Sequence, residues 1–153
     1  MRVVSVRPVL ALTVGLSLAG PVLSAEPARP EFLNTPESLA RNLPFSEAVR
    51  AGDFMFLAGQ IGDKDGKVVP GGIAAEARQT LQHIKDVLER NGSSLGDVVK
   101  CTVFLADIAE WPAFNTVYRE FFKQPFPARS AFAASGLAMN ARVEVECIAY
   151  VPR

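Results

Sequence analysis

Histidine and cysteine are scarce in this chain of 153 residues, which contains one histidine and two cysteines. A protein metal site needs several ligands, and His83 has no second histidine and no cysteine near it at ligand spacing. We therefore expect no bound metal and interpret His83 as a surface residue. The sequence also lacks a Ser-His-Asp set and a Gly-rich phosphate loop, which excludes most enzymes of those classes.

Two cysteines are too few for a scaffold built on disulfides. Each lies in an expected strand, and the two-residue period of a strand places each on an apolar face. Cys101 shares its face with Val99, Val103 and Leu105, and Cys147 shares its face with Val143, Val145 and Ala149. We predict that both are small core hydrophobes, with a cross-strand disulfide as the alternative.

No apolar run reaches the length that a membrane-spanning helix needs. The stretch from Val9 to Val22 has about 14 residues, where about 20 are required. It follows a segment with two arginines and precedes the small residues Ser24 and Ala25, a pattern typical of a secretory signal. We predict that residues 1–25 are a cleaved signal peptide and that the mature protein is secreted, in the periplasm, without a membrane attachment. An uncleaved anchor is the alternative.

Neither sign of charge predominates, because Lys and Arg total 16 and Asp and Glu also total 16. Cleavage would remove Arg2 and Arg7, which leaves 14 basic and 16 acidic residues and a net charge of about −2. Non-specific nucleic-acid binding depends on clustered Lys and Arg, and the sequence shows no basic run or basic patch with interleaved aromatics. We therefore expect no nucleic-acid partner.

The remaining chain is long enough for one domain with a core. Residues 26–42 are Pro-rich and without periodicity, so we expect an extended N-terminal arm before a domain at 43–153. Strand patterns cover residues 45–50, 54–61, 67–69, 98–106, 129–134 and 142–151.

Two amphipathic helices interrupt these strands. The first has its apolar face at Ile73, Ala77, Leu81, Ile84 and Leu88 and ends at Asn91 and Gly92. The second is expected to be N-capped by Asp107 and to carry Trp111, Phe114, Val117, Tyr118 and Phe121 on one side. The order β-β-β-α-β-α-β-β, with both helices on one face of a single sheet, predicts a two-layer α+β domain.

The other face of this sheet is mixed in character. On the last strand it carries Glu144, Glu146, Ile148 and Tyr150, and such faces often meet another subunit. Glu144 and Glu146 are two residues apart, so their side chains point the same way, about 7 Å from each other. They are a candidate acid/base pair. The alternative is that they are solvated or paired with Lys100 or Arg142.

Arg129 stands at the start of the strand that follows a proline-containing turn. Its planar guanidinium matches a carboxylate, which can belong to Glu144, to another chain or to a ligand. The pattern by itself slightly favours a structural partner over a ligand.

Five segments together resemble the RidA (YjgF, reactive intermediate deaminase) family: AGQIG at 58–62, VVKCTVFLAD at 98–107, FNTVYREFF at 114–122, FPARS at 126–130 and RVEVECIAYV at 142–151. The resemblance covers nearly all of residues 45–151 in order. It implies a chorismate-mutase-like α+β fold with a mixed sheet, assembled as a homotrimer with ligand pockets between subunits.

The resemblance also implies an activity, the hydrolysis of reactive 2-imino or enamino acids to 2-keto acids and ammonia without a cofactor. Arg129 matches the family arginine that binds the substrate carboxylate, and Glu144 matches the glutamate near the attacking water. Asn115, together with the backbone around Gly59 and Ala131, falls on pocket positions.

Three pocket positions depart from the better-known deaminases. Phe45 replaces a tyrosine, Ala58 a serine and Ala131 a common cysteine. We therefore expect a more apolar pocket that prefers a bulkier imino acid or binds another carboxylate. Two alternatives remain, a non-catalytic trimer that binds small carboxylates or proteins, and the endoribonuclease or translation-inhibitor activity ascribed to some relatives.

Overall fold

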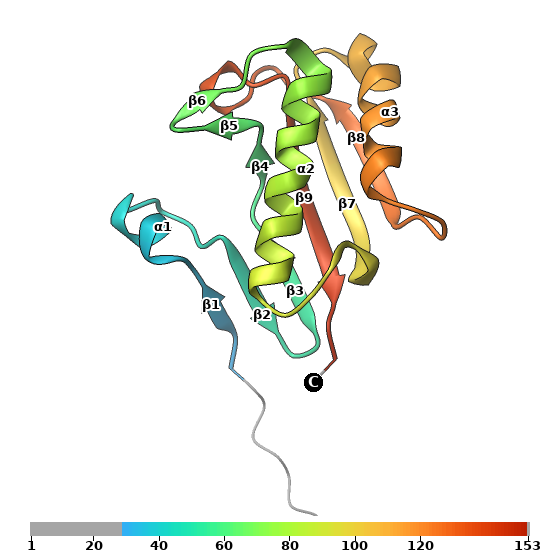
Figure 1. Ribbon diagram of the computed structural model, residues 1–153. Coiled ribbons are helices and arrows are strands. Elements are labelled where there is room, and N and C mark those ends of the chain that lie inside the picture. Colours follow the sequence, from blue (N-terminus) through green and yellow to red (C-terminus); the bar gives the residue numbers. More distant parts are fainter. Residues whose placement is uncertain (1–28, 153) are drawn as a thin grey trace, which may run out of the picture.

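A mixed sheet covered on one face by two helices forms the body of the chain in the computed structural model, which describes residues 29–152 (Figure 1). The sheet has the order β1-β2-β3-β9-β7-β8, with β4 beside β9. Its strands are β1 (Glu31–Leu33), β2 (Ala48–Ala51), β3 (Phe54–Leu57), β4 (Gln60–Ile61), β7 (Val98–Leu105), β8 (Ala128–Ala133) and β9 (Val143–Tyr150). The β7–β8 pair is parallel and the other pairs are antiparallel, which confirms the predicted mixed, two-layer α+β fold. The predicted signal peptide lies outside the described residues.

The longer helix, α2 (Gly72–Arg90), follows the predicted apolar period. Ala77, Leu81, Ile84 and Leu88 are buried, and the chain leaves the helix through Asn91 and Gly92, whose φ of 74° suits glycine. Within residues 29–152 no helix combines the length and the apolar character needed to cross a membrane.

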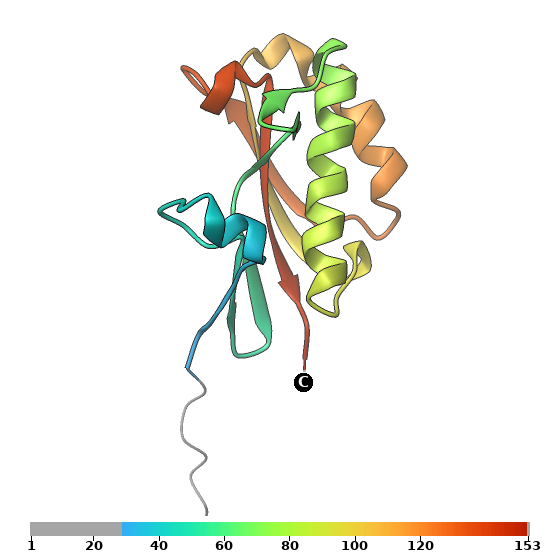
Figure 2. The ribbon, with the colours of Figure 1, turned by 60° about the vertical axis from the view of Figure 1, so that its left-hand side comes forward.

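The second helix, α3 (Trp111–Phe121), begins one turn later than its predicted cap. Asp107 caps the short 3-10 turn η2 (Ile108–Glu110), where its side chain accepts a hydrogen bond from the Ala109 amide, and α3 continues from that turn. Figure 2 shows α2 and α3 on the same side of the sheet.

The core lies between this helical layer and the alternating apolar residues of β7 and β9. Cys101, Val103 and Leu105 of β7 are fully buried, as the two-residue period predicts. Val99 is the exception, because a register shift between Val98 and Lys100 turns it to the surface.

The two cysteines form a disulfide, which is the alternative given above and corrects the prediction of two separate core thiols. Cys101 and Cys147 are directly opposite each other on β7 and β9, and both are buried at 0% and 1% exposure. Periodicity placed each on a buried face, but the strand register that makes them neighbours is a tertiary property.

The expected N-terminal arm is not uniformly extended. β1 pairs with β2, and Thr35 caps the short helix α1 (Pro36–Ala40) by accepting a hydrogen bond from the Ser38 amide. The expected strand at 54–61 is broken at Ala58 and Gly59, and β5 (Asp63–Lys64) and β6 (Lys67–Val68) form a separate hairpin. Two further 3-10 turns, η1 (Leu95–Asp97) and η3 (Ala138–Asn140), complete the fold.

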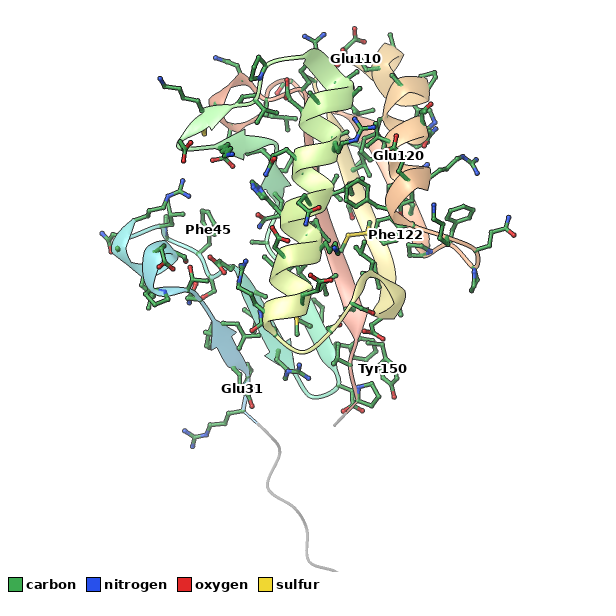
Figure 3. The ribbon with its side chains drawn as sticks, in the orientation of Figure 1. Glu31, Phe45, Glu110, Glu120, Phe122 and Tyr150 are labelled. Atoms are coloured by element: carbon green, nitrogen blue, oxygen red, sulfur yellow. A yellow bond between two sulfur atoms is a disulfide. The ribbon has the colours of Figure 1, made fainter. Side chains whose placement is uncertain are left out.

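The face of the sheet away from the helices, called here the open face, is rich in aromatic side chains. Phe54, Phe56, Phe132 and Tyr150 are each 42% to 48% exposed, and Figure 3 labels Tyr150 near the end of β9. The Phe54 and Tyr150 rings have centroids 5.4 Å apart. An exposed cluster of this kind is typical of a surface that meets another protein.

Candidate functional site

Arg129 faces the helical layer. On β8 it lies beside Cys101 of β7, whose side chain points into the core, and its guanidinium reaches α3. Nη2 of Arg129 donates a hydrogen bond of 2.6 Å to Oδ1 of Asn115. The predicted pocket residues Arg129 and Asn115 are therefore neighbours, although 14 positions separate them in sequence.

The charge of Arg129 has no carboxylate partner within residues 29–152, since none of the salt bridges of this region includes it. Its Nη1 is buried and makes no hydrogen bond to the described residues. Burial lowers the pKa of Arg129, while Tyr118 raises it and Arg119 lowers it to a smaller extent. A guanidinium in this position favours an anion supplied from outside the chain.

Glu144 lies on the open face of β9, with Val143 and Val145 pointing to the core on either side of it. Burial raises the pKa of the Glu144 carboxyl, and the neighbouring Glu146 raises it further. A raised pKa makes the carboxylate a stronger proton acceptor than an ordinary glutamate.

The structural partners proposed above for Glu144 are engaged elsewhere. Arg142 forms a salt bridge with Glu110, and Nζ of Lys100 donates to Oγ of Ser130. Glu144 is therefore paired with neither basic residue.

The Glu144 carboxyl lies over Gly59, in the break between β3 and β4. A Cβ atom added at Gly59 would fall 2.9 Å from Cδ of Glu144, so only glycine leaves room for the carboxylate there. Ala58, the residue before it, donates its amide to the carbonyl oxygen of Glu47 at 3.0 Å. The predicted importance of Gly59 has a direct steric reason.

A cavity of about 830 Å³ contains this carboxylate, and its lining includes Phe45, Gly59, Met139 and Glu144. Figure 3 labels Phe45, which follows α1 and lies on the side of the arm that faces α2. Phe45 is 56% exposed, so its ring is an accessible wall of the site.

The predicted site residues thus form two groups within one chain. The Glu144 group contains Phe45, Gly59 and Glu144, with Ala58 next to Gly59 in the chain, and the Arg129 group contains Asn115, Arg129 and Ala131. Ala131 shares the face of Arg129, because it lies two residues further along β8. The Arg129 and Glu144 side chains are on opposite faces of the sheet, so the structure does not bring them together.

His83, expected at the surface, is partly exposed and lines the cavity. It is half-buried, its Nδ1 lies 3.1 Å from the carbonyl oxygen of Ile61, and its Nε2 lies 2.8 Å from Nε2 of Gln79. These contacts give the ring a structural role between α2 and β4. Among residues 29–152 no three metal-ligating side chains cluster.

The sequence and the fold match those of known proteins. Residues 35–151 match the model of the family described as endoribonuclease L-PSP. The chain belongs to this family, also called YjgF/RidA.

Two curated relatives in this family cover most of the domain. A RutC family protein of Pyrococcus horikoshii is 45% identical over 109 residues, which are 70% of this chain and 86% of the relative. The 2-iminobutanoate/2-iminopropanoate deaminase of Dermatophagoides farinae is 42% identical over 110 residues, which are 71% of this chain and 86% of the relative. The crystal structure of RidA from a Psychrobacter species has a TM-score of 0.69 and 33% identity, over 71% of this chain and 89% of the other.

Sequence reasoning missed the surroundings of Arg129. Trp111, Phe114 and Tyr118 were expected only as the apolar side of a helix, yet their rings lie 4.8 Å, 5.8 Å and 4.4 Å from the Arg129 guanidinium carbon. The available signal was the spacing of three and four residues, which places these rings and Asn115 on one helix face.

Proposed function

We propose that this RidA-family protein hydrolyses 2-imino acids to 2-keto acids and ammonia, at sites formed between neighbouring subunits of a homotrimer. The observation that carries the proposal is the Arg129 cation, which contacts Asn115 and lacks a carboxylate partner among the described residues. Relatives named 2-iminobutanoate/2-iminopropanoate deaminase at 39% to 42% identity support this substrate class.

In the proposed site, Arg129 binds the carboxylate of the imino acid. Its remaining N–H groups hold the substrate in one orientation, and such positioning contributes substantially to lowering a reaction barrier. Asn115 fixes one guanidinium nitrogen through its 2.6 Å hydrogen bond.

Glu144 acts on water in this scheme. The substrate enters as the iminium, with its nitrogen already protonated by solvent. The Glu144 carboxylate takes a proton from water as the water oxygen bonds to C2 and the C=N electron pair moves to nitrogen, which gives a tetrahedral amino alcohol. Glu144 then returns that proton to the nitrogen, the C–N bond breaks and ammonia leaves, and the C2 hydroxyl gives its proton to Glu144 and on to solvent to form the ketone, which balances the proton first taken up by the imine. One water is consumed, one ammonia is released, and no redox step is involved.

A second subunit is required because the Arg129 and Glu144 side chains lie on opposite faces of the sheet. In a closed ring, the Arg129 group of each subunit meets the Glu144 group of the next. The exposed aromatic side chains of the open face provide the apolar contact area for such an assembly. We place the mature trimer in the periplasm after cleavage of residues 1–25, on the basis of the signal pattern.

The test compares wild type with Arg129→Ala on imino acids generated by an amino-acid oxidase, with 2-keto acid and ammonia as the products measured. We expect a loss of at least about a hundredfold in kcat/KM with the trimer intact. Arg78→Ala is the matched control, because Arg78 pairs with Glu120 on the exposed side of the helices. Unchanged hydrolysis in Arg129→Ala would overturn the proposal.

A non-catalytic carboxylate-binding trimer is the second candidate, favoured by the apolar replacements at Phe45, Ala58 and Ala131. It predicts that wild type binds 2-keto acids through Arg129 but does not accelerate imine hydrolysis. The family description also names an endoribonuclease, so cleavage of an unstructured RNA is measured in the same preparations. The acidic mature charge disfavours that activity.

A further inference from the structure

One face of α3 surrounds the Arg129 guanidinium. The ring centroids of Tyr118, Trp111 and Phe114 lie 4.4 Å, 4.8 Å and 5.8 Å from its central carbon. Asn115, on the same helix face, accepts from Nη2. A single helix therefore supplies both the rings and the one hydrogen bond that hold this cation.

Such an arrangement restricts a side chain that is otherwise mobile. An arginine loses much rotamer freedom when it is fixed, and aromatic faces attract a guanidinium through their negative quadrupole. The rings accept no hydrogen bond from the edge of the guanidinium, so the guanidinium keeps N–H groups without a protein acceptor, and those on Nη1 are buried. Partial desolvation also strengthens the attraction of the guanidinium for an anion.

We propose that Trp111 and Tyr118 are positioning residues for the Arg129 carboxylate clamp and that they set its preference for an anionic ligand over a neutral one. This inference rests on the proposed function of Arg129 as the clamp. Phe114 is fully buried and more distant, so its main role is core packing.

Trp111 differs from an ordinary core residue, whereas Tyr118 belongs to the core cluster and contacts Arg129 from within it. Trp111 is only partly buried, although large core side chains such as Phe114 are completely enclosed. The Tyr118 hydroxyl is buried and has no hydrogen-bond partner among residues 29–152, so the contact with Arg129 depends on the ring. Phenylalanine at position 118 should therefore preserve the effect, while an aliphatic side chain should not.

The experiment measures the dissociation constants of 2-oxobutanoate and its neutral amide by calorimetry, in the intact oligomer. Trp111→Leu should weaken 2-oxobutanoate binding about tenfold, the change expected for a desolvated cation–π contact, and leave amide binding unchanged. Trp111→Phe should restore most of the preference, because it restores an aromatic face.

The matched control is Phe126→Leu. It removes an aromatic ring that lies 5.5 Å from Arg119, another arginine carried by α3, and it leaves the three rings around Arg129 in place. It should bind both ligands like wild type. Tyr118 is tested in the same way with an aromatic and an aliphatic replacement. Tyr118→Phe should retain the preference for the anion, and Tyr118→Leu should reduce it. Thermal unfolding and oligomeric state are measured for every variant.

Equal affinities of Trp111→Leu and wild type for 2-oxobutanoate, in folded oligomers, would overturn the positioning role. An equal loss of affinity for 2-oxobutanoate and for its amide would also overturn it, because it would indicate a general packing defect. If wild type itself does not prefer the acid, or if Arg129→Ala keeps the preference, Arg129 does not bind the ligand carboxylate. That result would also refute the proposed function. The two failures are therefore distinguishable.

Discussion

Arg129 and Glu144 lie on opposite faces of the same sheet, with β7 between the strands that carry them. Arg129 contacts α3 in the helical layer, while Glu144 lies on the open face over Gly59. One chain therefore cannot present both groups to a molecule as small as an imino acid. A shared site requires that one subunit supplies the cation and its neighbour supplies the carboxylate.

Gly59→Ala should displace Glu144 and reduce kcat about tenfold or more, because the added methyl group would lie 2.9 Å from the Glu144 Cδ. The flexible carboxylate end can move, so the unfolding temperature should change little. Gly136→Ala is the control, since a Cβ there meets no atom within 4 Å. Wild-type turnover in Gly59→Ala would show that the position of Glu144 does not matter.

Glu146→Gln should shift the acidic limb of the pH–rate profile to lower pH. Burial and the charge of Glu146 both raise the pKa of Glu144, so the active carboxylate is lost by protonation as pH falls through that raised value. Removing the Glu146 charge lowers the pKa and extends activity to lower pH. Glu89→Gln, on the exposed end of α2, should leave the profile in place, and a shift to higher pH in Glu146→Gln would contradict this assignment.

Replacing both cysteines by alanine should reduce the free energy of unfolding by about 2 to 4 kcal/mol, because the disulfide joins residues 46 positions apart and is fully buried. Urea unfolding measures this loss. Thiol labelling of denatured wild type should detect no free cysteine before reduction and both Cys101 and Cys147 after it. Two labelled thiols before reduction would contradict the bonded form.

The apolar replacements in the site predict substrate preference. Phe45, Ala58 and Ala131 should favour imino acids with larger apolar side chains over 2-iminopropanoate by about tenfold in kcat/KM. Phe45→Tyr combined with Ala58→Ser should reduce this preference. A wild type that acts best on the smallest imino acid would refute the expectation.

The sequence predicted the elements that follow a clear period. The apolar residues from Ala77 to Leu88 give the face of α2, and the alternation of β9 places Glu144 and Glu146 together on the open face. Val99 was misplaced because a single irregularity in register reverses the alternation. β1 and α1 were missed because both are short and their segment lacks a period.

The contacts of the site depend on tertiary structure and were less predictable. The resemblance identified Arg129, Asn115, Gly59 and Glu144, but periodicity cannot show on which face of the sheet Arg129 lies. That depends on the parallel pairing of β7 and β8, a long-range property. The same limitation applies to the Cys101–Cys147 register and to the aromatic rings around Arg129.

Mixing two inactive variants tests the shared site most directly. Arg129→Ala and Glu144→Gln, co-expressed in equal amounts, should regain about a quarter of wild-type activity, because one in four randomly formed subunit contacts then joins an intact Arg129 to an intact Glu144. Arg129→Ala mixed with the double variant should remain inactive. No recovery in confirmed mixed trimers, with each variant inactive alone, would contradict a site completed between subunits.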